Sequence, residues 1–535
     1  MFKFLEKIPL YPFLIAIYPI LYLLSENINE IGVSAGLRSA LILFIACVLV
    51  FLFALILTRN IRKSGLVALF VILVFFLIFF VLYAPVYRGL RNVALFGHVL
   101  GRHRYLMPGT LFLLLLTAVA GILALRKTRG KVLGTLSMVL NLVALVLVAI
   151  PLITIISFSV KNAKQMTMAQ ADLPEVGQSL TVMDGNQPDI YYIILDMHTS
   201  DNVMLKLMDY DDAAFSDQLR EIGFDIAECS RSNYGKTQQS LTSSLNMLYL
   251  QDLTDTPDVS TLYPMFQSST VRRSLEEAGY QTIAFETGYA FTQLEDADEY
   301  YKPIEGTLDL LTYPGITPFE SLIMQVSGGK ILYETREQLS KRMQYIIDAP
   351  YVQYRERILY TLKVLPTLTE IEGPKFVFAH ILAPHDPFVF DKDGNAAFRR
   401  TPFTMNQDPE FTAGYGWNEY SKAYVNELEY IHREILSIVK KIITESDTPP
   451  VIIIQGDHGI PRSGVDDAQF EIYNAYYFGG RTDLGISDTI TPVNSFRILF
   501  NEMFGTKYPL LSDESFEMDS QTNQYTLFDV SFTCP

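Results

Sequence analysis

The residues best suited to chemistry are carboxylates and imidazoles that follow apolar runs. Three such runs carry them: PDIYYIILD ends on Asp196, PPVIIIQGDHG contains Asp457 and His458, and KFVFAHILAPHDPF contains His380 and His385. Each acidic residue alone could be a turn or a helix cap. Convergence of Asp and His from separate strands instead predicts a site for one divalent metal ion, with Mn or Zn favoured and Mg or Ca as alternatives.

A candidate nucleophile lies in the segment SRSNYGKTQQSLTSSL. Gly235 permits close approach of the backbone, Lys236 supplies positive charge, and Thr237 opens a helical stretch. The N-terminus of a helix favours anions, because its free amides and its dipole point outward. A hydroxyl there, next to a divalent metal, can be deprotonated and attack phosphorus. The competing interpretation is that Thr237 only caps the helix.

These residues need a scaffold that brings strand ends together, and the apolar pattern predicts one. Runs typical of buried strands alternate with helical patterns from residue 189 onward, which indicates a largely parallel sheet with helices on both faces. Ligands in such folds bind beyond the carboxyl ends of the strands. The predicted strands are 188–196, 280–287, 375–381 and 449–457, and the predicted helices are 211–223, 420–445 and 495–505. Residues 307–370 are mostly helical in pattern and are expected to form an insertion or cap.

Charge divides the 535-residue chain into two unlike parts. Residues 1–160 carry 14 Lys and Arg against 3 Asp and Glu, which leaves 28 against 55 for the rest of the chain. The parts therefore have net charges of +11 and −27, which argues for different surroundings. The acidic part is a poor partner for nucleic acid, since it would repel phosphate backbones.

The first part is expected to be a five-helix transmembrane domain. Each of its apolar stretches is near the ~20 residues that cross a bilayer; they are about 8–24, 39–58, 65–84, 106–125 and 132–157. Their centres hold no Asp, Glu or Lys, which argues against a transporter.

Basic residues before the first stretch, between the second and third, and between the fourth and fifth place the N-terminus in the cytoplasm. Residues 161–188, a polar tether, and 189–535, the catalytic domain, are then extracytoplasmic, and the protein is a multi-pass protein of the plasma or inner membrane. The basic loop 85–105 disagrees with this rule; it either contacts anionic lipid headgroups or marks a different topology there.

At the motifs quoted above, over about residues 189–505, the chain resembles the alkaline phosphatase/sulfatase superfamily. It is most similar to the membrane-bound branch that contains lipoteichoic acid synthases and lipid phosphoethanolamine transferases. The resemblance implies a sulfatase-like α/β domain in which Asp196, Thr237, Asp457 and His458 bind the metal and Thr237 is the nucleophile. It also implies that His385, in His-Asp-Pro-Phe, binds the substrate phosphate, with His380 and Lys236 as further substrate-binding candidates.

Three departures bear on the substrate, and one is that GYAFTQLEDADEYY occupies about the place of the Trp/Arg pair that holds the glycerol phosphate group in lipoteichoic acid synthases. The first acidic ligand is Asp where the close relatives use Glu, and the three cysteines, Cys47, Cys229 and Cys534, cannot form the several disulfides of the phosphoethanolamine transferases. A Cys229–Cys534 bridge is conceivable. A formylglycine sulfatase needs Cys or Ser in C/S-x-P-x-R, and Cys229-Ser230-Arg231 lacks the proline.

The expected activity is metal-dependent transfer of a phospho-alcohol group, of phosphoglycerol or phosphoethanolamine type, through a phospho-threonine. The expected partners are a membrane lipid as donor and an envelope polymer or lipid as acceptor. A sulfatase-like hydrolase of phosphate or sulfate esters and a non-catalytic envelope-binding domain are the alternatives. The sequence leaves open the role of His198 and the oligomeric state.

Overall fold

The computed structural model describes most of the chain. The residues outside the description are 1–4, 29–31, 83–85, 87–88, 91–92, 96–97, 100–102, 126–129, 173–177, 179, 181–186, 256, 304–314, 398–400, 406–415, 463–464, 482–483, 519–524 and 528–535. The side chains of 161–172 and of several residues in 103–125 are also outside it. Arg88, Arg91 and Arg102 of the basic loop 85–105, on which the predicted lipid contact depends, therefore lie outside the described residues.

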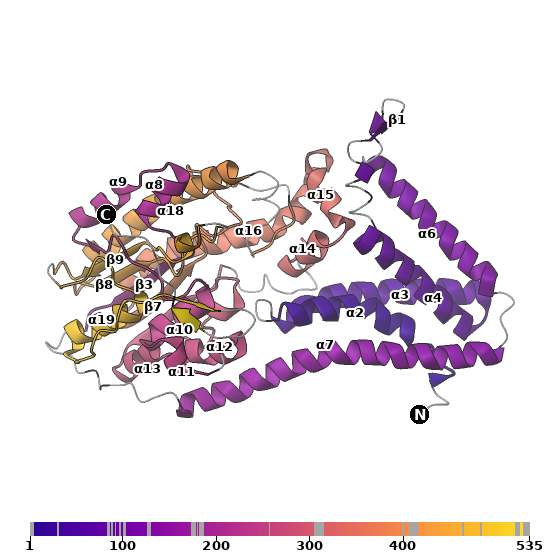
Figure 1. Cartoon of the computed structure of the whole chain (residues 1–535), viewed down its shortest axis with the longest axis horizontal. Helices are drawn as coiled ribbons and strands as arrows, with labels where there is room; N and C mark the ends of the chain where they lie inside the picture. The colour runs from indigo at the N-terminus through magenta and orange to yellow at the C-terminus, as the bar shows by residue number, and fades with distance from the viewer. Residues whose placement is uncertain are drawn as a thin grey trace. The chain divides into compact units, whose positions relative to one another are not determined.

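The N-terminal region is helical, and the described residues of each predicted apolar stretch lie mostly in helices (Figure 1). The helices are α2 (Tyr11–Glu26), α3 (Leu37–Thr58) after the 3₁₀ turn η1 (Val33–Gly36), α4 (Ile61–Phe76) continued by the π-helix η2 (Leu77–Leu82), α6 (His103–Leu125) and α7 (Gly130–Asp172). A short antiparallel pair, β1 (Ala94–Leu95) and β2 (His98–Val99), precedes α6.

Three described segments are long and apolar enough to cross a membrane: Val33–Thr58, Ile61–Phe80 and Gly130–Val160. Helix α2 is apolar but shorter. Large apolar side chains such as Ile56 and Ile153 are exposed on these helices, as contact with lipid requires. The helices thus indicate membrane anchoring through three candidate spans, and five spans stay a prediction.

Helix α7 runs further than the sequence predicted. It continues without a break through residues 161–172, which were expected to belong to a tether. This stretch is rich in Ala, Lys, Gln and Met, all good helix formers, and no proline interrupts it before Pro174.

The chain divides into two compact units that do not follow the expected boundary. The first unit joins Met1–Ser159 with Gly306–Pro350 and Arg399–Thr404; the second holds Val160–Glu305, Tyr351–Phe398 and Met405–Pro535. Much of the predicted insertion therefore belongs with the apolar helices.

The insertion is helical, as predicted, and specific contacts hold its first half in the first unit. It contains α14 (Pro318–Gln325), η4 (Gly328–Lys330), α15 (Ile331–Glu334), η5 (Arg336–Gln338), α16 (Lys341–Val364) and η6 (Leu365–Glu370). Phe319 is buried against Ile20 and Leu24 of α2. The Arg38 Nε of α3 donates to Glu320 Oε1 at 2.8 Å, and both side chains are largely buried.

The second unit is built on a seven-stranded, mostly parallel sheet in the order β4-β9-β8-β3-β7-β5-β6. The strands are β3 (Ile190–Leu195), β4 (Asp225–Ile226), β5 (Gln281–Phe285), β6 (Glu299–Tyr301), β7 (Lys375–Ile381), β8 (Val451–Gln455) and β9 (Asn474–Phe478). Strands β8, β3, β7, β5 and β6 run parallel, whereas β9 is antiparallel to both β8 and β4. The four predicted strands are confirmed; β4, β6 and β9 were not predicted.

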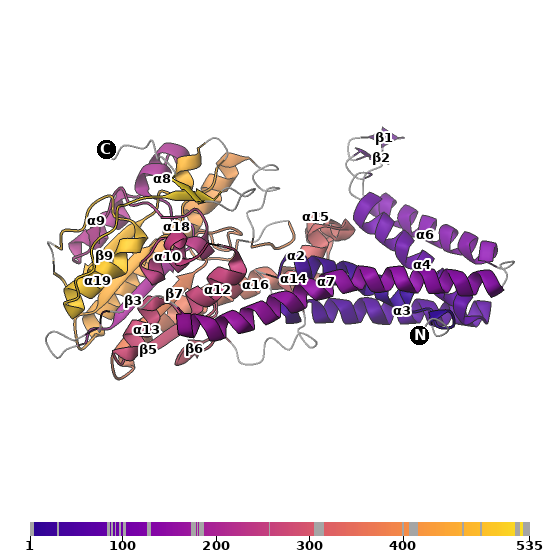
Figure 2. The same cartoon turned by 60° about the horizontal axis from the view of Figure 1, so that its bottom comes forward.

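Helices cover both faces of this sheet, as Figures 1 and 2 show. Alternate residues of β3, Ile190, Tyr192 and Ile194, belong to one apolar core with side chains of the helices on that face. Those helices are α10 (Thr237–Asn246), α11 (Leu250–Leu253), α12 (Val259–Gln267), α13 (Thr270–Glu277) and α19 (Ser495–Phe504). On the other side lie α8 (Asp201–Met208), α9 (Ala213–Glu221) and α18 (Trp417–Glu445).

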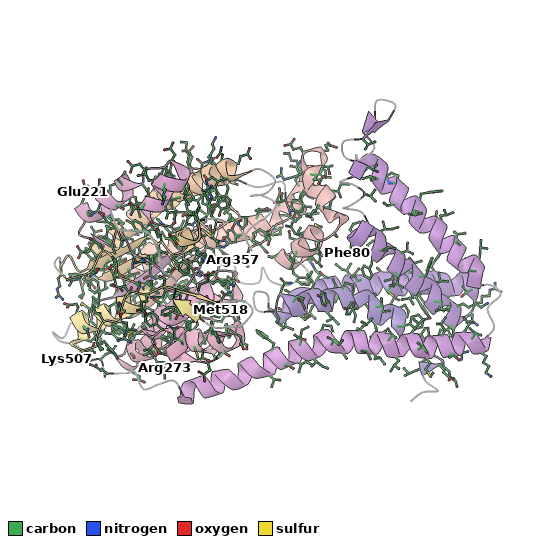
Figure 3. All side chains as sticks on the ribbon, in the orientation of Figure 1. Phe80, Glu221, Arg273, Arg357, Lys507 and Met518 are labelled. Atoms are coloured by element: carbon green, nitrogen blue, oxygen red, sulfur yellow. The ribbon has the colours of Figure 1, made fainter. Side chains whose placement is uncertain are left out.

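Side chains fill the space between these layers (Figure 3). The remaining short elements of the unit are η3 (Ala290–Thr292), η7 (Asp466–Gln469), η8 (Pro492–Asn494) and the antiparallel pair β10 (Phe516–Met518) and β11 (Tyr525–Leu527). The central strands are buried on both faces, so their carboxyl ends are held by rigid neighbours.

Candidate active site

Asp196, Asp457 and His458 meet at the carboxyl edge of the sheet. Asp196 follows β3 and its backbone N–H donates to the Ile381 carbonyl at 3.0 Å, so the end of β7 holds it. Asp457 follows β8, and its Oδ1 accepts from the Met197 backbone N–H at 3.0 Å. One ligand atom from each of Asp196, Asp457 and His458 lies within 4.8 Å of the others. The predicted meeting of these side chains is therefore observed.

The two further histidines join the same edge. His380 lies within β7 rather than after it, paired in register with Ile194 of β3. Its Nε2 is 3.2 Å from Asp196 Oδ2. The ring of His385 is 6.4 Å from the ring of His458, centroid to centroid.

Hydrogen bonding directs the ring nitrogen of His458 toward the carboxylates. Its Nδ1 lies 2.8 Å from the Gly459 carbonyl, which can only accept, so Nδ1 carries the proton. The lone pair is then on Nε2, which is 3.8 Å from Asp196 Oδ1 and 3.7 Å from Asp457 Oδ2. A backbone acceptor on one nitrogen is the usual way a protein orients a metal-binding histidine.

The site has the polar atoms that a divalent cation needs. Asp196 Oδ1 and Asp457 Oδ2 are buried and have no hydrogen-bond partner among the described residues. The same holds for His380 Nε2, which is close to Asp196 but poorly aligned for a hydrogen bond. Two buried carboxylates side by side are costly unless a cation compensates them. The donor set of two carboxylates and an imidazole suits zinc or manganese.

Charge in the site favours an ionised Asp196. Burial by itself would raise the pKa of Asp196, but His385, His380 and His458 together hold that pKa well below its ordinary value. Burial opposes a charge on His385, yet Asp196 and Asp386 raise the pKa of the His385 imidazole above its ordinary value. The surroundings of the carboxyl edge thus favour a negative charge on Asp196 beside a positive charge on His385.

Thr237 is the first residue of helix α10 and is buried. The helix-capping position belongs to Lys236, whose side chain makes no capping hydrogen bond. The interpretation of Thr237 as the N-cap is therefore wrong. Its prediction as the start of a helix is confirmed, and it belongs to the first turn, whose backbone amides have no partner within the helix.

One segment, residues 468–472, ties the loop of Thr237 to the loops of the metal-ligand candidates; we call it the bridging segment. The Gly459 N–H donates to Gln469 O at 2.8 Å, and the Ser232 N–H donates to Phe470 O at 2.7 Å. The Thr199 hydroxyl donates to Glu471 O at 2.9 Å.

The bridging segment also reaches the residue next to Lys236. A Cβ on Gly235 would lie 3.1 Å from the Gln469 side chain, so this side chain packs against Gly235. The loops after β3, after β8 and before α10 therefore share one support.

Cys229 and Ser230 have structural roles. Cys229 is disulfide-bonded, whereas Cys47 is free and buried; Cys534, the partner left open by the sequence, lies outside the described residues. The Ser230 hydroxyl is buried, donates to Ile490 O at 2.6 Å and accepts from Asn474 Nδ2 at 3.0 Å. Neither side chain is available for conversion to a formylglycine.

The structure also gathers a cluster that sequence reasoning missed. His198, Asp212 and His432 are buried, and one ligand atom of each lies within 4.8 Å of the others. The position of His198, two residues after Asp196, could have indicated that it belongs to a site. His432 lies in the middle of α18, and no sequence pattern distinguishes it.

Comparison with known proteins agrees with this architecture. The sulfatase family matches residues 193–494, more than half of the chain. No curated protein sequence matches. Among solved structures, the C-terminal periplasmic domain of EcEptC from Escherichia coli, in complex with Zn, is similar at 12% identity and a TM-score of 0.42, over 66% of this chain and 96% of that one.

A second similar structure is the integral membrane lipooligosaccharide phosphoethanolamine transferase A from Neisseria meningitidis. It is 14% identical with a TM-score of 0.39, over 94% of this chain and 95% of that one. With its mostly parallel sheet, its Asp and His residues at the strand ends and the match over residues 193–494, the chain belongs to the sulfatase family and has the enzyme fold of the alkaline phosphatase/sulfatase superfamily.

Proposed function

We propose that this protein is a membrane-anchored, metal-dependent transferase. It moves a phospho-alcohol group, of phosphoglycerol or phosphoethanolamine type, from a lipid donor to an envelope acceptor through a phospho-threonine at Thr237. The observation that carries the proposal is the buried pair Asp196 and Asp457, whose unpartnered oxygens face His458 at the carboxyl edge of the sheet.

Asp196, Asp457 and His458, with the Thr237 oxygen, would hold one divalent ion, zinc or manganese. When bound, the ion would lower the pKa of the Thr237 hydroxyl and withdraw electron density from the substrate phosphorus. The free amides at the start of α10 would favour the negative charge on Thr237 Oγ.

The first step forms a bond between Thr237 Oγ and phosphorus and breaks the bond between phosphorus and the donor-lipid oxygen. The threonine proton leaves to solvent, and the departing lipid alkoxide takes up a proton and becomes an alcohol. The product is a phosphodiester between Thr237 and the small alcohol.

The second step reverses this chemistry with another alcohol. A hydroxyl of the acceptor attacks phosphorus and loses its proton, the bond to Thr237 Oγ breaks, and Thr237 regains a proton. The Thr237 hydroxyl is regenerated, so the cycle consumes only the donor and the acceptor.

Charged groups around the edge are suited to hold the phosphate. An imidazolium on His385 would pair with a non-bridging oxygen, with His380 close by on β7 and Lys236 next to the nucleophile. The backbone N–H of Val389, just after His-Asp-Pro-Phe, donates to Glu427 Oε2 of α18 at 3.1 Å, which anchors this loop.

The membrane helices would bring the site to its lipid donor. In this proposal residues 161–535 are extracytoplasmic and α7 leads out of the membrane. A cysteine introduced at Gln178 should react with a membrane-impermeant thiol reagent in intact cells, or in spheroplasts where an outer membrane intervenes. One at Arg62 should react only after lysis, and equal labelling at both sites would contradict the topology.

Mass spectrometry of the peptide that contains Thr237 tests the function. After incubation of the full-length protein with total lipid extract, we expect an adduct on Thr237 whose mass identifies the phospho-alcohol. Water in place of the acceptor alcohol would make the enzyme a phosphodiester hydrolase with the same adduct. Absence of any adduct, together with release of sulfate from sulfate esters, would favour the sulfatase-like alternative.

A further inference from the structure

The cluster of His198, Asp212 and His432, which the sequence did not predict, is buried. All three residues follow Asp196 in the sequence. His198 lies in the loop after β3, Asp212 directly precedes α9, and His432 lies within α18. All three side chains are nine-tenths or more buried. None of them belongs to the catalytic mechanism proposed above.

A hydrogen bond determines which nitrogen of His198 can accept. The His198 Nδ1 is 3.0 Å from the Thr199 carbonyl, which can only accept, so Nδ1 carries a proton. The neutral His198 ring then has its lone pair on Nε2. The His432 Nδ1 is 3.2 Å from Asp212 Oδ1, which brings this imidazole close to the carboxylate.

These two Nε2 atoms are 2.6 Å apart. At this distance the lone pair of His198 Nε2 faces either an N–H of His432 or a metal ion that lies between the two side chains.

The Asp212 carboxylate distinguishes these two possibilities. Asp212 Oδ2 is buried and has no hydrogen-bond partner among the described residues. A hydrogen bond between the rings would leave this oxygen without a partner, whereas a cation bound by one ligand atom of each residue would give it one. Two imidazoles and one carboxylate are a ligand set typical of zinc. Two nitrogens bound to one tetrahedral zinc ion would be about 3.4 Å apart, since each Zn–N bond is ~2.1 Å.

Aromatic rings make the surroundings rigid and of low dielectric. The Phe215 ring is stacked on His432 at 3.6 Å between centroids, and the Tyr473 ring is 4.6 Å from His198. In such surroundings an uncompensated charge is costly, and a bound cation with an anionic ligand is favoured.

We propose that His198, His432 and Asp212 bind a second divalent metal ion, of the zinc class, with a structural role. This ion would stabilise the turn that carries Asp196. Met197 has left-handed backbone, φ 63°, and Tyr424 of α18 donates to the Met197 carbonyl at 2.9 Å. A metal that joins His198 to α18 would fix the same turn from its other end.

Metal stoichiometry of the full-length protein in detergent tests this proposal. After dialysis against zinc and removal of the excess, we expect two equivalents in the wild type, one in Asp457→Ala and one in His432→Ala. The double variant should hold none. The proposal would be overturned if the wild type held one equivalent of zinc and Asp457→Ala held none. The second cluster is intact in both of these proteins, so misfolding of a His432 variant cannot cause that result.

A cobalt experiment keeps the test decisive where His432→Ala fails to fold. His432→Cys retains a metal ligand, so cobalt should give a thiolate-to-cobalt charge-transfer band that the wild type lacks. Tyr424→Phe is the matched control on the same helix; it removes a buried hydroxyl but no ligand, and it should keep both equivalents. A folded His432→Cys protein without this band would overturn the proposal.

Discussion

The two buried clusters are built from the same residue types but are supported differently. Asp196, Asp457 and His458 follow adjacent parallel strands, whereas His198, Asp212 and His432 come from a loop, a helix start and a helix interior. The first cluster is supported by the loop of Thr237 through the bridging segment, and the second is packed between Phe215 and Tyr473. The proposed nucleophile belongs to the loop that shares this support with the first cluster, and aromatic rings surround the second, so we expect catalysis at the first cluster and a structural role for the second.

Removing one metal-binding side chain from each cluster should give the largest difference in turnover. Asp457→Ala should lower turnover at least ~10³-fold, because several kcal/mol of charge stabilisation are lost with the ion. His432→Ala touches no reacting atom and should lower turnover ~10- to 100-fold, the range for residues that orient metal ligands. Turnover is measured with a fluorescent lipid donor, and thermal melting measures stability. Equal losses of turnover in the two variants would contradict the assignment of catalysis to the first cluster only.

Gly456→Ala should damage both clusters at once. A Cβ at Gly456 would lie 2.2 Å from the backbone oxygen of His198, so either Asp457 or His198 must move. We expect a loss of about 3 kcal/mol in the free energy of unfolding, the upper part of the range for overpacking. Gly235→Ala is the matched control, because the three atoms nearest to its Cβ would all belong to the Gln469 side chain rather than to the backbone. Chemical denaturation compares them, and similar stability of the two variants would show that Gly456 and His198 are not in close contact.

Tyr424→Phe should have the smallest effect. It removes a hydroxyl that donates to Met197 O and accepts from the Thr199 N–H at 3.2 Å, and it leaves both backbone groups buried and unpaired. The expected loss is about 2 kcal/mol of stability, with both metals retained. Loss of either metal would mean that Tyr424 positions the metal-binding side chains. The turn that carries Asp196 would then depend more on Tyr424 than on the second ion.

The first cluster could be predicted from sequence and the second could not, for a physical reason. Asp196 and Asp457 end apolar runs. Adjacent parallel strands place their carboxyl ends at the same edge of the sheet, whatever the conformation of the connecting segments. His432 is one of many residues on a long helix, and only the packing of α18 beside α8 and α9 places it next to His198. The extension of α7 to Asp172 was missed because polarity was taken to indicate a tether, although the helix propensity of that stretch favoured continuation.

Thr237 gives the most direct test of the central claim, that the carboxyl edge holds a nucleophile and a metal together. Thr237→Ser keeps a hydroxyl and should retain part of the turnover, whereas Thr237→Asn keeps a polar helix start but cannot attack phosphorus. We expect Thr237→Asn to melt like the wild type, to form no lipid-derived adduct, and to lose at least ~10³-fold in turnover. Turnover of Thr237→Asn above about a tenth of the wild type would contradict the phospho-threonine mechanism, since a lost covalent nucleophile leaves far less.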